Sequence, residues 1–207
     1  DYDATLGVLF GVDVFLGSTG ITHYFPVLTR KTYQLPASLS GLTVTDADVL
    51  RTGSLSGLVM LTEIHVSDTV ATIEVGAFAN TTSLKSMTLP FIGISLSSTG
   101  NDALLGAIFG RSNYGVVTTS YYQGSFRYYL PNSLESLEIT GGTVIHDYAL
   151  MNLRNLREVS LPSSITWIGK QSFYNDIALA GIFLPEELTV IDDLAFSFDA
   201  SILPSLD

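Results

Sequence analysis

Histidine, aspartate, glutamate and serine are the side chains of this sequence that could do chemistry, and their spacing decides what they can do. The histidines, His23, His65 and His146, stand far apart, without the second histidine or the cysteine that a zinc site needs. Cysteine is absent, which also excludes disulfides and thiol nucleophiles. The sequence contains no nucleophile elbow, phosphate-binding loop or dinucleotide fingerprint. We therefore expect no catalytic residues, no metal and no cofactor.

Acidic residues do occur close together. Neighbouring carboxylates at 186–187 and 192–193 would point to opposite faces of an extended chain, which suits solvated turns better than an acid–base pair. Asp46 and Asp48 would share a face, but no further oxygen ligands accompany them. A calcium site at this pair is therefore the weaker alternative to a solvated surface.

The element that must position any functional surface is a short repeat with the pattern apolar-x-x-apolar-x-apolar. Its copies cover 39–44, 61–66, 84–89, 134–139, 156–161 and 179–184. Within each group of three, the copies start 22 or 23 residues apart, which is the period of leucine-rich repeats. Such units cannot bury their apolar side alone and must stack. We predict a mostly β, α+β leucine-rich-repeat solenoid with one sheet of short strands, little helix and two long insertions.

Alternation along each copy decides which side chains face outward. In 156–161, Val159 and Leu161 point inward, whereas Glu158 and Ser160 point outward. The fifth and third residues of successive copies should then form two outward columns on the face that repeat proteins commonly use for binding. The fifth-residue column is Thr43, His65, Thr88, Glu138, Ser160 and Phe183, and the third-residue column is Gly41, Glu63, Ser86, Ser136, Glu158 and Gly181. A merely solvated sheet face is the open alternative.

Several residues of these columns are candidates for ligand binding: His65, Thr88, Glu138, Ser160 and Phe183. Small polar residues and carboxylates suit a shallow, wet contact with a protein or a glycan. Phe183 and Trp167 are aromatic residues at otherwise polar or mixed positions, so each is either an anchor or partial core. Glu138 and Glu158 lie in different columns, which disfavours a glycosidase pair, and we expect no enzyme.

The repeat pattern is interrupted between Pro90 and Leu130. Residues 104–109 predict a short core-packing helix or turn. An aromatic run follows, and its members are further candidates for ligand binding because tyrosine combines a large contact area with a polar group. They are Tyr114, Tyr121, Tyr122, Phe126, Tyr128 and Tyr129. The alternative is that half of these side chains pack the insertion onto the array.

The sequence also contains a longer internal repeat, which includes several of the short copies. Leu61 and Phe78 match Leu156 and Phe173 at an offset of 95 residues. We interpret residues 1–207 as a single solenoid segment made of a duplicated block, about 1–101 and 102–207. The insertions would cover about 1–34 and 91–130. Because the sequence has no initiator methionine and no leader, we expect a piece of a longer protein.

Composition narrows the possible partners. With 46% hydrophobic and 14% charged residues, the chain has ample material for a packed core. A net charge of −11 with nine lysines and arginines argues against nucleic acid and against attraction to an anionic membrane. No apolar stretch approaches the roughly 20 residues that a membrane-spanning helix needs. We expect no membrane insertion and an extracellular or cell-surface location.

The stretch from Leu156 to Phe173 resembles the BspA-like leucine-rich repeats of bacterial and protozoan surface proteins. That family repeats L-x-x-I-x-[LI]-P, followed by I-G-x-x-[AS]-F, and the resemblance covers about residues 35–202. Two copies depart from the pattern: 39–60 lacks a clean Ile-Gly and Ala-Phe, and Leu150 replaces the phenylalanine. The resemblance implies a solenoid without a shared active site and with links to adhesion, host-protein binding and surface display.

Two hypotheses about function follow. The first is a non-enzymatic recognition or adhesion module, which binds a protein or glycan on a host or neighbouring cell through the strand face or the tyrosine-rich insertion. The second is a structural spacer or assembly subunit of a larger cell-surface or extracellular structure, with lateral self-association.

Overall fold

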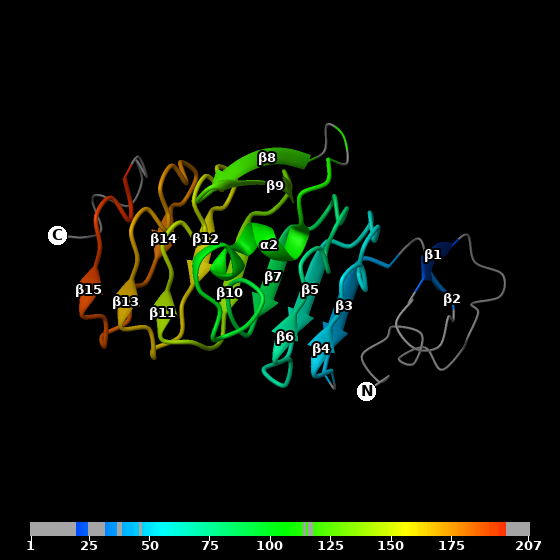
Figure 1. Ribbon diagram of the computed structural model, residues 1–207, viewed down its shortest axis with the longest axis horizontal. Helices are drawn as coiled ribbons and strands as arrows, with labels where there is room; N and C mark the ends of the chain where they lie inside the picture. Colours follow the sequence, from blue (N-terminus) through cyan, green and yellow to red (C-terminus); the bar gives the residue numbers. More distant parts are fainter. Residues whose placement is uncertain are drawn as a thin grey trace.

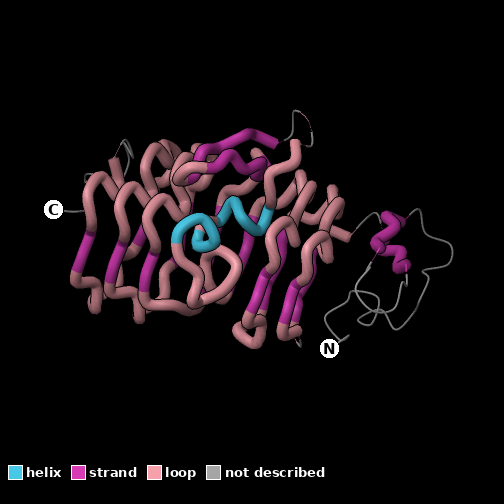
Figure 2. The backbone as a smooth tube through the Cα atoms, viewed as in Figure 1, coloured by secondary structure: helices cyan, strands magenta, loops and turns pink. Residues whose placement is uncertain are grey.

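The computed structural model describes residues 20–24, 32–36, 39–45, 47–113, 115 and 118–197. From residue 39 onward these residues wind into a solenoid whose turns stack side by side along the long axis of the molecule (Figure 1). Each turn carries a short strand, and most turns carry a second, two-residue strand on the opposite side (Figure 2). The predicted solenoid with little helix is thus confirmed.

The main sheet has six parallel strands, one from each predicted copy. Its order is β14-β12-β10-β7-β5-β3, in which the neighbours follow the chain. Its strands are β3 (Gly41–Val44), β5 (Glu63–Val66), β7 (Ser86–Leu89), β10 (Ser136–Ile139), β12 (Glu158–Ser160) and β14 (Gly181–Ile182). Exposed and buried residues alternate along β5 and β12, because side chains on a strand point to alternate faces.

The second strands form two shorter parallel ladders. One joins β4 (Val49–Leu50) to β6 (Thr72–Ile73), and the other joins β11 (Val144–Ile145), β13 (Trp167–Ile168) and β15 (Val190–Ile191). Between them the insertion approaches the ladder, and the Ile73 N–H donates to the Ile94 carbonyl at 2.9 Å. The second residue is buried in four of these five strands, at Leu50, Ile73, Ile145 and Ile168, whereas Ile191 of the last strand is 46% exposed.

The insertion leaves after β7 and returns before β10. It contains the 3-10 helix η2 (Gly100–Ala103), the helix α2 (Leu105–Phe109) and an antiparallel hairpin of β8 (Thr118–Gln123) and β9 (Phe126–Pro131). All five residues of α2 are buried, which confirms the predicted core-packing helix. Strands β7 and β10 nevertheless pair directly, with Met87 opposite Leu137.

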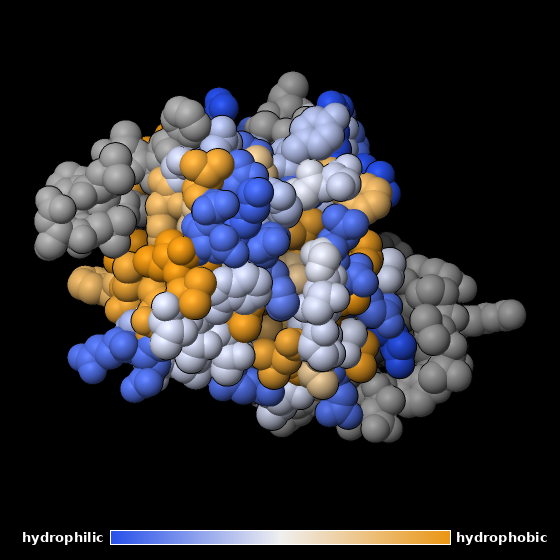
Figure 3. Space-filling model, turned by 60° about the vertical axis from the view of Figure 1, so that its left-hand side comes forward, coloured by the Kyte–Doolittle hydropathy of each residue, from blue (hydrophilic) through white to orange (hydrophobic). Residues whose placement is uncertain are grey.

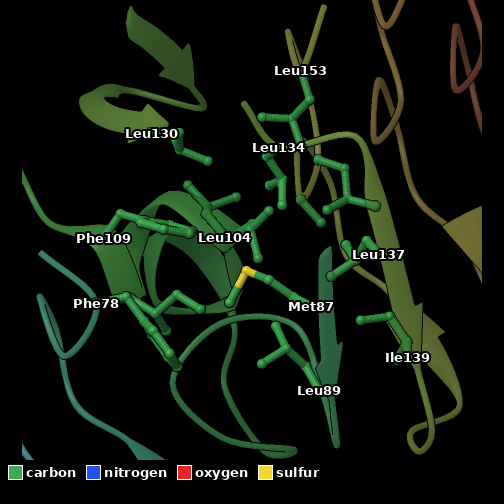
Figure 4. Close-up of a cluster of buried hydrophobic side chains, with 14 of the residues drawn as sticks. Phe78, Met87, Leu89, Leu104, Phe109, Leu130, Leu134, Leu137, Ile139 and Leu153 are labelled. Carbon is green, nitrogen blue, oxygen red and sulfur yellow. The ribbon is translucent and has the colours of Figure 1, made fainter. Parts of the chain in front are cut away.

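The core follows the inner side of the coil and continues under the insertion. Figure 4 shows α2 and Leu130, near the end of β9, closing over the strand side chains from β7 and β10. The cluster includes Phe78, Met87, Leu89, Leu104, Phe109, Leu130, Leu134, Leu137, Ile139 and Leu153. Leu55 and Leu150 replace the family's phenylalanine in two turns, and both are fully buried.

A second antiparallel hairpin lies near the N-terminus, where β1 (Gly20–Tyr24) pairs with β2 (Thr32–Pro36). Leu35 and Pro36 of β2 match Leu130 and Pro131 of β9 at the 95-residue offset. The upstream part of the first block lies outside the described residues, so the division into two blocks stays a prediction.

Candidate binding surfaces

The outward columns of the main sheet are in register. Thr43 pairs with His65, His65 with Thr88, and Thr88 with Glu138. Glu138 in turn lies opposite Ser160. The expected alignment therefore exists, whereas ligand binding by these residues stays a prediction.

This strand face is flat and acidic. His65, Glu138 and Glu158 are exposed. The Thr88 hydroxyl donates to Glu138 Oε2 at 3.0 Å, so part of the face is already hydrogen-bonded across strands. Glu138 is level with Ser160 rather than with Glu158, so the two carboxylates do not form a directly opposed pair. The face offers a row of exposed polar side chains as a contact surface.

Phe183, at the end of the fifth-residue column, is 92% exposed, the highest value among the described large hydrophobic side chains. It belongs to the last described turn. Other exposed apolar side chains of that turn are Ile177, Val190, Ile191 and Leu194. In Figure 3, which brings this end of the molecule forward, apolar side chains gather next to polar ones.

The aromatic side chains of the insertion divide into a buried and an exposed group. Tyr121 and Tyr128 are buried, at 8% and 4% exposure. Phe126 and Tyr129 are half-buried, and Tyr114 lies outside the described residues. Because the first two side chains face the array, they are placed to hold the hairpin rather than to meet a partner.

Tyr128 packs directly on Gly106 of α2. A Cβ atom added at Gly106 would lie 2.4 Å from the tyrosine ring, so no other residue fits there. The Tyr128 hydroxyl donates to the Asn101 carbonyl at 3.4 Å, and burial raises the pKa of this phenol above its usual value of 10.0. The ring thereby fastens the hairpin to both short helices.

Tyr122 is the aromatic residue that the hairpin displays, at 53% exposure. The Arg127 guanidinium lies 4.9 Å from its ring centroid and donates to its hydroxyl at 3.0 Å, which raises the pKa of the arginine. Arg111 lies 4.3 Å from the Phe126 ring centroid in the same way. Two arginine–aromatic pairs therefore occupy the hairpin and the loop before it.

Gln123 anchors this hairpin and was not predicted from the sequence. Its side chain is fully buried. Its Oε1 accepts from the Gly106 N–H at 2.7 Å, and its Nε2 donates to the Met151 carbonyl at 3.3 Å. The Asn152 amide adds a bond to the Tyr122 carbonyl at 2.8 Å. The hairpin is thus tied to α2 and to the next turn of the array.

A hollow of about 340 Å³ opens between η2, the β8–β9 turn and the β11–β13 ladder. Trp167, predicted as an anchor or as partial core, lines it. Burial lowers the pKa of the neighbouring His146 below its usual 6.5, opposed by the charge of Asp147. Sequence reasoning did not find this hollow, because its walls come from segments far apart in the chain.

Among the described residues, no group of three or more histidine, aspartate and glutamate side chains could hold a metal ion. Asp48 is exposed, and Asp46 lies outside the described residues. The Asp193 N–H donates to the Asp192 carboxylate at 2.7 Å, an arrangement typical of a turn. In the part of the chain that the structure describes, no helix is both long and apolar enough to cross a membrane.

Parallel strands that recur every 22 or 23 residues on both sides of one insertion, with apolar side chains inward and polar ones outward, define a leucine-rich-repeat solenoid. The family model of the BspA-type leucine-rich repeat region matches residues 50–129 and 119–203, in six copies. The chain therefore belongs to the BspA-type leucine-rich repeat family. Leucine-rich repeat proteins are generally non-enzymatic.

Solved structures with a similar chain course include three bacterial leucine-rich repeat proteins. A leucine-rich repeat protein from Bacteroides ovatus is 18% identical, with a TM-score of 0.39, covering 75% of this chain and 31% of that one. One from Eubacterium ventriosum is 18% identical, with a TM-score of 0.44, covering 80% and 36%. A leucine rich cell surface protein from Faecalibacterium prausnitzii is 18% identical, with a TM-score of 0.41, covering 76% and 36%. The chain spans about a third of the length of these proteins, and no curated protein matches it.

Proposed function

We propose that this chain is a non-enzymatic recognition module at the cell surface, which binds a partner protein or glycan through the outer side of the β8–β9 hairpin. The observation that carries the proposal is the pair of arginine–aromatic contacts, Arg127 with Tyr122 and Arg111 with Phe126. Tyrosine and arginine are the residues most enriched among the energetic centres of protein interfaces. Membership of the BspA-type family supports the cell-surface location.

The hairpin also has the rigidity that a binding element needs. Gln123 and Tyr128 fix its inner side by hydrogen bonds and packing, so the exposed side chains are held before a partner arrives. Preorganisation of this kind reduces the conformational entropy that binding would otherwise cost. The strand face, with His65, Thr88 and Glu138, would extend the contact as a polar surface.

The test is a double variant, Tyr122→Ala with Arg127→Gln. The labelled chain is measured against a panel of purified extracellular proteins and glycans and against intact cells. Binding by the unaltered chain and a loss of about tenfold or more in the variant are expected, because truncated central residues typically cost 2 kcal/mol or more. The control is Met60→Ala, an exposed apolar residue remote from the hairpin in sequence. Equal losses in both variants, or binding to no member of the panel, would contradict the proposal.

The exposed apolar residues of the last described turn favour a second candidate, a spacer or assembly subunit that associates with other chains. Phe183, Val190 and Ile191 would be covered in such an assembly. Sedimentation of the chain at rising concentration tests this candidate. It predicts a concentration-dependent mass that Phe183→Ser reduces, whereas a constant monomer mass would rule out self-association.

A further inference from the structure

The hollow beside Trp167 combines flat apolar walls with polar groups. It lies between the insertion and the second ladder, in the region where the helices of Figure 2 approach β11 and β13 of Figure 1. Its lining includes Asn101, Ser125, His146, Asp147, Tyr148 and Trp167. At about 340 Å³ and open on one side, it falls at the small end of ligand-binding pockets.

Trp167 forms one wall where the neighbouring turns carry small side chains. It pairs with Val144 on one side of the ladder and with Val190 on the other. A valine is therefore large enough to pack at this position of the ladder, and the fold does not require the larger indole of Trp167. Its partial exposure leaves aromatic surface free for a ligand.

Tyr148 forms another wall at a strained position. Its φ is +63°, a conformation that costs a bulky residue energy. In the first two turns of the array the same place, three residues after the inward residue of the second strand, is taken by Gly53 and Gly76, with φ of +72° and +74°. Gln171 and Leu194 hold this place in the last two described turns with φ of +52° and +57°, so the coil sets the conformation, and the aromatic ring is what distinguishes Tyr148.

The polar groups of the hollow both donate and accept hydrogen bonds. One oxygen of Asp147 accepts from the Lys170 N–H at 2.8 Å, which orients the exposed carboxylate. Burial lowers the pKa of His146, which favours the neutral ring, in which one nitrogen donates and the other accepts. The amide of Asn101 and the hydroxyl of Ser125 can each donate and accept hydrogen bonds. Of the residues that line the hollow, none is a lysine or arginine.

We propose that this hollow binds a neutral sugar residue of a glycan, with the ring stacked on Trp167 and its hydroxyls bonded to Asp147, His146 and Asn101. A sugar ring has an apolar face of C–H groups and a rim of hydroxyls that need both donors and acceptors. An anion would be repelled by the carboxylate and would find no cation. A quaternary ammonium group would use the aromatic walls but leave the donors of His146, Asn101 and Ser125 unpaired.

This inference rests on the proposed recognition function and names a ligand class at a site separate from the outer side of the hairpin. The chain contains one tryptophan, so tryptophan fluorescence, excited selectively over that of the ten tyrosines, reports on this hollow. Methyl glycosides of glucose, galactose, mannose and N-acetylglucosamine are titrated up to about 50 mM, above the millimolar dissociation constants of weak ligands. A saturable change in emission with at least one of them is expected, with saturation transfer to the same sugar in NMR.

Two variants locate the binding. Trp167→Val introduces the residue that both neighbouring strands of the ladder carry at this position. This variant is expected to lose sugar binding, which is measured by NMR. Asp147→Asn keeps the oxygen that accepts from Lys170 and is expected to weaken binding about tenfold, the effect of one charge-assisted hydrogen bond. The matched control, Val49→Ala, alters an outward residue of the other ladder and should bind as the unaltered chain does. Circular dichroism and thermal melting establish that each variant folds.

Three results would overturn the inference. They are no binding of any of the four glycosides, undiminished binding by folded Trp167→Val, and binding of choline in place of the sugars. The proposed function fails separately, because its readout is the loss of panel binding in the Tyr122 and Arg127 double variant. If both Trp167→Val and that double variant still bind a sugar, the sugar binds at neither of the two sites.

Discussion

In five turns, the residue three positions after the second residue of the two-residue strand has positive φ, but its identity changes along the array. Glycine holds this position at Gly53 and Gly76, whereas Tyr148, Gln171 and Leu194 hold it in the later turns. The backbone conformation is therefore set by the coil and not by the residue. For Tyr148 the side chain has a use in the hollow, and for Gln171 no such use is evident.

Replacing Gln171 by glycine should therefore stabilise the fold. Its φ of +52° costs a non-glycine residue about 1–2 kcal/mol, and the added freedom of the unfolded chain offsets about 0.4–1 kcal/mol of the gain. We expect a rise of about 0.5 kcal/mol in the free energy of unfolding, measured by urea titration. Tyr148→Gly should gain less, because it also removes a half-buried ring that packs against the core, and it should weaken sugar binding. A clear loss of stability in Gln171→Gly would show that its side chain contributes packing.

His146 should make stability depend on pH below neutrality. Burial lowers the pKa of the folded state below 6.5, the usual value that the unfolded chain keeps. As the pH falls below 6.5, the unfolded state binds the proton first, so stability is lost progressively until the folded pKa is passed. Urea titrations at pH 7.5 and at pH 5.5 measure the loss, and His146→Gln should reduce it. An unchanged difference in that variant would assign the pH dependence to other groups.

At the scale of elements, the strands follow directly from the sequence, and the hairpin could have been predicted. The inward residues Ile64 and Val159 sit on strands because alternation and period agree. Gly124-Ser125 between two aromatic runs is a two-residue hairpin signal, and Gly124 has the positive φ such turns need. With that pairing, alternation assigns Tyr121 and Gln123 inward and Tyr122 outward. The exposure of single tyrosines was therefore available from the pattern, although sequence reasoning treated the run as one loop.

The hollow could not be predicted in the same way. Its walls come from η2, the hairpin turn and two rungs of the ladder, and their meeting depends on how the insertion folds back. No local pattern in the sequence reports that approach. The sequence singles out Trp167 only because an aromatic residue is unusual at this position of the repeat. It does not show which residues lie around the indole ring.

Gln123 gives the element-scale prediction. Gln123→Leu keeps the bulk but leaves the buried Gly106 N–H without its acceptor, at a cost of about 1–3 kcal/mol. Since the bond joins the hairpin to α2, hydrogen exchange should rise first in residues 118–131, before the main sheet opens. Ser125→Ala, in the exposed turn, is the control and should leave exchange unchanged. Uniform loss of protection in Gln123→Leu would mean that the hairpin and the array unfold together.

At the scale of the whole molecule, charge works against folding. The net charge is −11, and the ion pairs Arg51–Glu74 at 3.5 Å and Arg157–Glu135 at 4.0 Å join exposed side chains that stabilise little. Screening should therefore relieve repulsion more than it weakens these pairs. The melting temperature should rise by a few degrees between about 20 and 300 mM sodium chloride. A fall would show that attractive pairs dominate.

The direct pairing of β7 with β10 has a consequence for how such a chain can diversify. The chain leaves one rung of the main sheet and re-enters at the next, so the outward columns keep their register whatever lies between. Part of the departing segment is not free to change, because Ile94 completes a rung of the ladder and α2 fills the core. The outer side of the hairpin, which follows α2, neither pairs with the ladder nor fills the core. Its residues can therefore change, and with them the binding specificity, while the main sheet and the core keep their structure.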